Sequence, residues 1–204
     1  MKTGEMLNKA KKYRGEVEEL LKTFKQNFYD PSKVWDELMY CLCTPQTKAV
    51  NALKACEEVK KLNRGRVEEI ASTLRRCGVR FHNNKARYIA EAKNHFPQLY
   101  EKIRVTSNLF ELREFLVKNV KGMGYKEASH FLRNIGFENV AIIDRHIFRY
   151  MLENRLISPN FGKLTARKYL TAESRLIRHA KRLGLTPALL DLLVWAVSTG
   201  RVAK

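Results

Sequence analysis

Apolar residues recur with helical spacing along nearly the whole chain, and this regularity limits the possible folds more than any other feature. After Asp30-Pro31, for example, Val34, Leu38 and Leu42 repeat every fourth residue and share one helix face. Alternating strand patterns and long Pro/Gly/Ser linkers are absent from the sequence. The sequence therefore predicts an all-α fold, with the same period over residues 17–24, 49–56, 86–93, 112–116 and 128–135 and further helices over 144–153, 163–183 and 187–199.

Several of these helices carry recognisable ends. Asn108-x-x-Glu111 resembles a capping box. Thr186-Pro187 provides an N-cap followed by proline at the first helical position. The last helix is apolar on almost every side, so we expect it to be buried. It ends at Gly200 and leaves a four-residue tail.

A glycine hairpin, Gly122-Met123-Gly124, separates two of the predicted helices. Glycine adopts positive φ angles and lets the backbone approach a ligand closely. The second helix starts near Tyr125, so its unpaired amides and the positive end of its dipole lie beside the hairpin. This arrangement favours a phosphate site, although many such glycine pairs are simple turns between helices.

Lys126 and Asp144 provide an amine and a carboxylate near this hairpin. They lie 18 residues apart (144 − 126), so one helix and a short return can bring both side chains to one cleft. Lys126 is in the first turn of its helix, where the dipole disfavours the ammonium, and only a neutral amine attacks as a nucleophile. Asp144 precedes a helix as a potential N-cap. The alternatives are a solvated or phosphate-binding lysine and a plain helix cap.

The charge of the chain indicates its partner. Thirty-nine Lys and Arg residues against 21 Asp and Glu give a net charge of +18 and a pI near 9.9. Such an excess favours a polyanion such as nucleic acid, although a basic surface also serves solubility. No targeting segment and no apolar run of membrane-spanning length is visible, so we expect an intracellular location.

The four cysteines fit no metal or cluster motif. Cys41 and Cys43 lie in an apolar helical run, and the spacing to Cys56 and Cys77 matches neither paired zinc knuckles nor an iron–sulfur run. We expect reduced structural thiols, with no metal and no cofactor.

The stretch NVKGMGYKEASHFLRNIGFENVAIIDRHI resembles the catalytic core of the helix-hairpin-helix (HhH-GPD) DNA glycosylase superfamily. The resemblance extends from about Trp35 to Phe148. It implies that Lys126 and Asp144 form the active pair and that the hairpin, with Lys121, Gly122 and Gly124, binds the DNA backbone. It also implies two helical lobes with an active-site cleft between them: residues 34–139 with the helix-hairpin-helix, and residues 1–33 plus 140–204 with the aspartate and the C-terminal tail.

Two further segments resemble DNA-contacting parts of these enzymes. ELMYCLCTPQTKAVNA is similar to an early helix-turn-helix that offers a glutamine to DNA, here Gln46. RFHNNKARYIAEAK is similar to the segment that presents a wedge or stacking residue, here Phe81 or His82. From the residues alone, Phe81 fits a core position equally well.

The C-terminus narrows the resemblance. LDLLVWAVSTGRVAK is similar to the end of the archaeal-type 8-oxoguanine DNA glycosylase/AP lyases, which implies that Trp195 stacks on the flipped base and that Lys204 takes part in recognising oxidised guanine. By composition alone, Trp195 is a core residue. No cysteine follows Cys77, which disfavours the iron–sulfur branch of the superfamily.

The resemblance thus implies a monomeric base excision repair enzyme acting on double-stranded DNA with 8-oxoguanine or abasic sites. Such an enzyme uses a lysine Schiff base and β-elimination, and would work in the cytoplasm on the nucleoid. Two alternatives remain at this point. One is a superfamily member for another lesion, namely an oxidised pyrimidine, a mispaired adenine or an alkylated base. The other is a non-catalytic module that binds duplex DNA.

Overall fold

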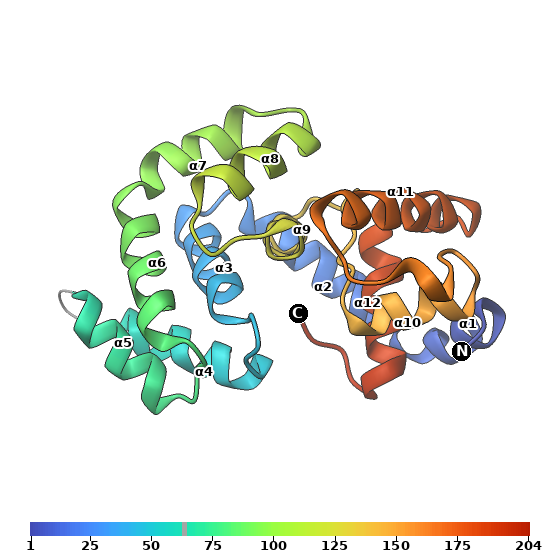
Figure 1. Ribbon diagram of the computed structural model, residues 1–204, viewed down its shortest axis with the longest axis horizontal. Coiled ribbons are helices and arrows are strands. Elements are labelled where there is room, and N and C mark those ends of the chain that lie inside the picture. The colour runs from blue at the N-terminus through green and yellow to red at the C-terminus, as the bar shows by residue number, and fades with distance from the viewer. Residues whose placement is uncertain (63–64) are drawn as a thin grey trace. The chain divides into compact units, whose positions relative to one another are not determined.

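The computed structural model of the protein describes residues 1–62 and 65–204 (Figure 1). It is 72% helical, and no β-strand occurs within the described residues, which confirms the all-α prediction. In chain order the helices are α1 Thr3–Ala10, η1 Lys11–Tyr13, α2 Arg14–Asn27, α3 Pro31–Cys43, α4 Ala49–Lys60, α5 Val67–Arg76, α6 His82–Asn94, α7 Phe96–Val105, α8 Leu109–Asn119, α9 Tyr125–Asn134, α10 Arg145–Glu153, η2 Pro159–Phe161, α11 Ala166–Arg182 and α12 Pro187–Thr199.

The chain divides into two compact units. Unit 1 comprises Met1–Tyr29 and Leu132–Lys204, and unit 2 comprises Asp30–Phe131. One boundary therefore falls directly before α3, and the other falls inside α9. The lobes expected from the sequence, 34–139 and 1–33 plus 140–204, stay a prediction about separate domains.

Unit 2 is built around α3, which contacts α4, α6 and α7. Asp30 caps α3 by accepting hydrogen bonds from the backbone of Ser32 and Lys33, and Pro31 occupies the first turn. The helical face predicted from the sequence is buried, with Val34 and Leu38 fully enclosed. All four cysteines are buried and none of them forms a disulfide, as predicted for structural thiols.

Helix α12 is the central helix of unit 1 and contacts α1, α2, α10 and α11. Its first turn is capped by Thr186, whose hydroxyl accepts from the Leu189 amide at 3.2 Å, and it ends at Gly200 with φ +79°. Its buried residues surround the helix axis, which confirms the predicted core helix: Pro187, Ala188, Leu189, Leu190, Asp191, Leu192, Leu193, Val194 and Ala196.

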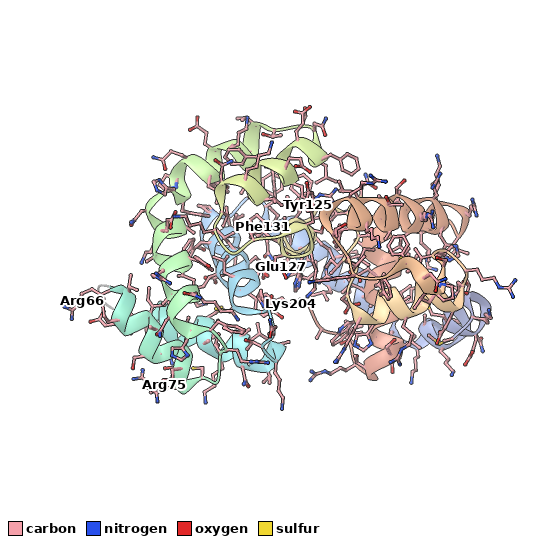
Figure 2. All side chains as sticks on the ribbon, in the orientation of Figure 1. Arg66, Arg75, Tyr125, Glu127, Phe131 and Lys204 are labelled. Atoms are coloured by element: carbon pink, nitrogen blue, oxygen red, sulfur yellow. The ribbon has the colours of Figure 1, made fainter. Side chains whose placement is uncertain are left out.

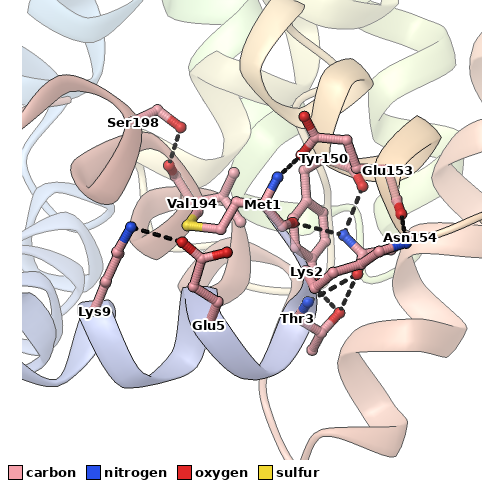
Figure 3. Close-up of polar contacts among 10 residues, drawn as sticks. All are labelled: Met1, Lys2, Thr3, Glu5, Lys9, Tyr150, Glu153, Asn154, Val194 and Ser198. Carbon is pink, nitrogen blue, oxygen red and sulfur yellow. Dashed lines mark hydrogen bonds and ion pairs between the residues drawn. The ribbon is translucent and has the colours of Figure 1, made fainter.

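The N-terminal helix is attached to α10 by polar contacts (Figure 3). The amide and the hydroxyl of Thr3 both donate to Asn154 Oδ1 at 2.8 Å. The Met1 ammonium pairs with Glu153, the last residue of α10. These contacts join residues more than 150 positions apart in sequence and close the core of unit 1 around α12.

Within the described ranges, no single helix is both long enough and apolar enough to cross a membrane. Helices α11 and α12 meet that test only as a pair bent by 92°.

Candidate active site

The helix-hairpin-helix consists of α8, residues 120–124 and α9, all of which lie at the predicted positions (Figure 1). Asn108 caps α8: its Oδ1 accepts from the amides of Phe110 and Glu111, and its Nδ2 donates to the Glu111 carboxylate at 2.9 Å. Gly122 has φ +83°, and a Cβ at this position would collide with the ring of Tyr88. Only glycine fits this turn without strain.

Four side chains hold α8 and α9 together. Arg113 of α8 is 1% exposed; it donates to the Ser129 hydroxyl of α9 at 3.2 Å and lies over the Tyr125 ring at 5.6 Å. A hydrogen bond to Glu114 raises the pKa of the Tyr125 hydroxyl. The hairpin is therefore fixed by side chains at the start of α9, which is where Lys126 lies.

Lys126 is the second residue of α9, and its side chain is 45% exposed. Among the described residues, its only ion-pair neighbour is Glu127, with 3.9 Å between Nζ and Oε1. Ala128 makes the first bond of the helix, to the Gly124 carbonyl at 2.9 Å, so Lys126 lies among the amides at the positive end of the helix dipole. Figure 2 labels its neighbours Tyr125 and Glu127. The lysine is accessible to a ligand at a helix N-terminus.

Lys121 lies on the hairpin itself and forms an ion pair with Glu91 of α6 at 2.9 Å. Both side chains are largely exposed, at 67% and 42%, and an exposed pair of this kind contributes at most about 1 kcal/mol. A phosphate could therefore replace Glu91 at small cost.

Two exposed turns of unit 2 carry the other predicted DNA contacts. Gln46 is exposed, with φ +54°, in the connection between α3 and α4. Phe81 is 52% exposed, with φ +57°, directly before α6, and the Arg80 guanidinium lies 5.4 Å from its ring centre. His82 is the half-buried first residue of α6. The exposure of Phe81 excludes the core position that the sequence left open.

Asp144 is the N-cap of α10 in unit 1. The amides of His146 and Ile147 each donate to its Oδ1 at 2.8 Å. Its other oxygen, Oδ2, accepts no hydrogen bond from the residues that the structure describes. The preceding run from Val140 is non-helical and buried, and its backbone is satisfied by side chains of α11: Ala141 donates to Glu173 at 3.2 Å and accepts from the Tyr169 hydroxyl at 2.8 Å. The predicted cap is present, and it uses one carboxylate oxygen.

A buried ion pair lies close to Asp144 in the same unit. Arg133 of α9 donates to Asp191 Oδ2 of α12 at 2.6 Å, and the two side chains are 5% and 4% exposed. Burial raises the pKa of the Asp191 carboxyl to about 7; Arg133 opposes this effect, and the nearby Asp144 adds to it. No local sequence signal indicates this ion pair, because its partners are 58 residues apart.

Trp195 and Lys204 both belong to unit 1. Trp195 is half-buried near the end of α12, and the Arg201 guanidinium lies 6.0 Å from its ring centre. Lys204, labelled in Figure 2, ends the tail that follows Gly200 and is also half-buried. Trp195 is thus partly accessible, in contrast to the fully buried leucines of the same helix.

No group of three or more His, Cys, Asp or Glu side chains that could hold a metal ion occurs in residues 1–62 and 65–204. What unit 2 offers is a glycine hairpin followed at once by an accessible lysine. This is the arrangement of the helix-hairpin-helix DNA glycosylases, which is the class that the sequence indicates.

Comparison with known proteins narrows the class. Residues 17–185 match the family model described as 8-oxoguanine DNA glycosylase. The 8-oxoguanine DNA glycosylase/AP lyase of Fusobacterium nucleatum is 36% identical, over 96% of this chain and 100% of its own length. The protein belongs to the 8-oxoguanine DNA glycosylase family, which confirms the resemblance.

Two solved structures agree with this assignment. The 8-oxoguanine DNA glycosylase of Thermotoga maritima matches with a TM-score of 0.89 and 32% identity, over 98% of this chain and 97% of that one. The Methanocaldococcus jannaschii 8-oxoguanine glycosylase/lyase, solved with a 15mer DNA containing 8-oxoguanine, matches with a TM-score of 0.85 and 33% identity. The match covers 98% of this chain and the whole of that one.

Proposed function

We propose that the protein removes 8-oxoguanine from double-stranded DNA and then cleaves the strand at the abasic site, as a bifunctional DNA glycosylase/AP lyase. The observation that carries the proposal is the accessible Lys126 in the first turn after the glycine hairpin, in a chain of this family. The relatives from Fusobacterium nucleatum and Methanocaldococcus jannaschii carry both activities in their names. The net charge of +18 suits a DNA substrate.

Lys126 is the nucleophile. The damaged nucleotide leaves the base stack, because its sugar is out of reach inside the duplex. The neutral amine then attacks C1′, so that a C1′–N bond forms and the glycosidic bond breaks, with 8-oxoguanine taking the bonding electrons and a proton. Ring opening gives a Schiff base, and loss of a proton from C2′ expels the 3′ phosphate by β-elimination. Water then releases the lysine.

Asp144 stabilises the positive charge that develops on the sugar. Its Oδ1 is used by the two cap bonds, whereas Oδ2 is available to a cation. Electrostatic stabilisation of a developing charge is usually the largest single contribution to catalysis. A helix cap and a catalytic carboxylate are therefore compatible roles for one side chain.

The hairpin and the exposed turns bind the rest of the DNA. Gly122 and Gly124 bring backbone amides to a phosphate, and Lys121 exchanges Glu91 for it. Phe81 fills the gap or stacks on a base, and His82 and Gln46 contact the duplex beside it; the exposed Phe81 ring supports this role.

The C-terminal end of unit 1 reads the damaged base. Trp195 stacks on the flipped 8-oxoguanine, and Lys204 distinguishes it from guanine. The partial exposure of the Trp195 ring supports a role at a binding surface. The protein acts as a monomer. It works in the cytoplasm on the nucleoid, because its substrate is chromosomal DNA.

Borohydride trapping tests the role of Lys126. Wild-type protein should become covalently linked to a duplex with 8-oxoguanine, because borohydride reduces the Schiff base. Lys126→Gln should give no adduct, whereas the control Lys22→Gln, which changes an exposed lysine of α2, should trap like the wild type. Persistent trapping by Lys126→Gln would remove Lys126 from its role. Parallel duplexes with thymine glycol, an A·G mispair, an alkylated base or an abasic site test the alternative lesions, and binding without any adduct would favour a non-catalytic module.

A matched pair of substitutions tests Asp144. Asp30 caps α3 by accepting from the amides of the second and third helical residues, as Asp144 does for α10, and asparagine caps helices as well as aspartate. Asp144→Asn should therefore keep its helix but slow base release by about 100-fold or more under single-turnover conditions. Asp30→Asn should change neither stability nor rate. Equal rates for both variants would reduce Asp144 to a cap.

A further inference from the structure

Two exposed turns of unit 2 have the same unusual backbone. The first turn, residues 44–48, joins α3 to α4, and the second turn, residues 77–81, joins α5 to α6. Gln46 and Phe81 have φ angles of +54° and +57°. A bulky residue such as Phe81 rarely adopts this conformation, and strain of this kind persists only where the surroundings enforce it.

Hydrogen bonds join the two turns side by side. The Thr47 hydroxyl accepts from the Arg80 amide at 3.2 Å, and the Asn51 side chain donates to the Gly78 carbonyl at 3.4 Å. Gln46 is the chain neighbour of Thr47, and Phe81 is the chain neighbour of Arg80. Gln46 and Phe81 are therefore both direct chain neighbours of residues in the Arg80–Thr47 hydrogen bond.

Lys85 of α6 supports the contact between the two turns through three hydrogen bonds. It lies in the first turns of α6 and is only 4% exposed. Its ammonium donates to the carbonyls of Cys43 and Pro45, both at 2.7 Å, and to the Thr47 hydroxyl at 3.0 Å. These three acceptors match the three hydrogens of an ammonium and belong to the first turn or the residue before it.

The environment of Lys85 links it to both turns and to the hairpin. Burial lowers the pKa of the Lys85 ammonium; the Arg80 guanidinium lowers it further, and the Glu127 carboxylate opposes both effects. Glu127 is the neighbour of Lys126 in α9. A buried lysine is costly unless its hydrogen bonds are satisfied, and here the carbonyls of Cys43 and Pro45 and the Thr47 hydroxyl satisfy them.

We propose that Lys85 and Thr47 are positioning residues that lock the two turns into one unit, so that Gln46 and Phe81 enter the DNA together at one lesion. This inference rests on the proposed function. Neither Lys85 nor Thr47 touches the reacting atoms. Their role is to remove the independent motion of the two turns, so that the aromatic ring and the amide are ordered before DNA binds. Preorganisation of this kind increases affinity, because ordering no longer has to occur on binding.

The test is a double-mutant cycle on DNA binding in the full-length Lys126→Gln protein, which does not consume its substrate. Thr47→Val removes the shared hydroxyl and keeps the side-chain shape. It should weaken binding to an 8-oxoguanine duplex about tenfold, and Thr47→Ser should restore binding. Phe81→Ala should also weaken binding, but Thr47→Val added to Phe81→Ala should have little further effect, because the positioned ring is gone.

A fluorescent base separates positioning from general damage. With 2-aminopurine next to 8-oxoguanine, wild-type binding should raise fluorescence as the stack opens, and Thr47→Val should reduce that rise even at saturating protein. Thr106→Val is the matched control, since the Thr106 hydroxyl, just after α7, donates to the Lys102 carbonyl at 2.7 Å and makes no other hydrogen bond to the described residues. It should behave as the wild type in both assays.

The outcomes separate the inference from the proposed function. The positioning role is overturned if Thr47→Val still weakens DNA binding tenfold in the Phe81→Ala background, or if Thr47→Val does not weaken binding in either background. If Thr47→Val does not fold, Asn51→Ala breaks the second link between the turns; a smaller loss coupled to Phe81 supports the proposal, and an additive loss overturns it. Absence of wild-type trapping together with coupled binding refutes the proposed lysine Schiff base but leaves the positioning role intact.

Discussion

The buried carboxyl of Asp191 should make the stability of this protein depend on pH in a way that one substitution removes. Asp191 is 3% exposed, and burial raises its pKa from the ordinary 3.8 to about 7 despite the Arg133 guanidinium 2.6 Å away. The folded protein therefore holds a proton here that the unfolded chain has lost between these two pH values. The stabilising contribution is complete below pH 3.8 and is lost as the pH rises to about 7.

The size of the effect follows from the two pKa values. From 3.8 to about 7 is a ratio of roughly a thousand in proton affinity. At about 1.4 kcal/mol per tenfold, this ratio corresponds to about 4 kcal/mol, of which about 3 kcal/mol falls between pH 4.5 and pH 8. Asp191→Asn keeps the shape and the acceptor for Arg133 but cannot titrate. Between pH 4.5 and pH 8, the free energy of unfolding of the wild type should therefore fall by about 3 kcal/mol relative to this variant.

Urea unfolding followed by circular dichroism measures this difference. Wild type and Asp191→Asn are unfolded at pH 4.5, 5.5, 6.5 and 8, and subtraction removes the titration of all other groups. Asp36→Asn is the control for loss of one negative charge, because Asp36 forms a surface pair with Lys60 at 3.1 Å. A constant difference between wild type and Asp191→Asn would show that Asp191 stays ionised in the folded protein, and that Arg133 outweighs burial.

Two further substitutions and one deletion test other parts of the structure. Gly122→Ala should destabilise the protein by about 1–3 kcal/mol in urea unfolding and weaken DNA binding, because its Cβ meets Tyr88 at a φ of +83°, whereas Gly15→Ala, with nothing within 4 Å, should not destabilise. Leu190→Ala should cost about 2–5 kcal/mol by the same assay, since Leu190 is fully buried in α12; a smaller loss would contradict its central place in the core. Deleting Lys204 should reduce discrimination between 8-oxoguanine and guanine in single-turnover cleavage more than it reduces cleavage of abasic sites, and equal losses would exclude a base-reading role.

The sequence predicted the helices well because their apolar faces and caps are local signals. Thr186 and Asn108 cap their helices as expected, with Pro187 in the first turn, and Asp144 is the N-cap of α10. The exposed position of Phe81 could not be predicted, since an aromatic residue before a helix fits a core as well as a surface. Its positive φ depends on the neighbouring turn around Thr47, which is 34 residues away in sequence.

The buried charged residues were missed for a related reason. Lys85 lies on the apolar face of α6, four residues before Ile89 and seven before Ala92, and that misplaced charge was a signal in the sequence. Its meaning, however, comes from carbonyls of another turn. Arg133 and Asp191 likewise acquire their roles only through a contact across 58 residues. The helical spacing of apolar residues shows which face of a helix is buried, but not which polar group of another element contacts that face.

Asp144 shows why the chemistry of a site is harder to predict than its fold. A cap needs one oxygen that accepts two amides, and Oδ1 meets that need here. Catalysis needs a carboxylate whose second oxygen is accessible, and the same side chain provides Oδ2. An aspartate directly before a helix is expected both for a simple cap and for a catalytic carboxylate. The sequence around Asp144 therefore cannot distinguish the two roles. Asparagine separates them, because it keeps the accepting oxygen of the cap and removes the negative charge. Normal helix content with slow base release in Asp144→Asn would therefore assign both roles to one residue.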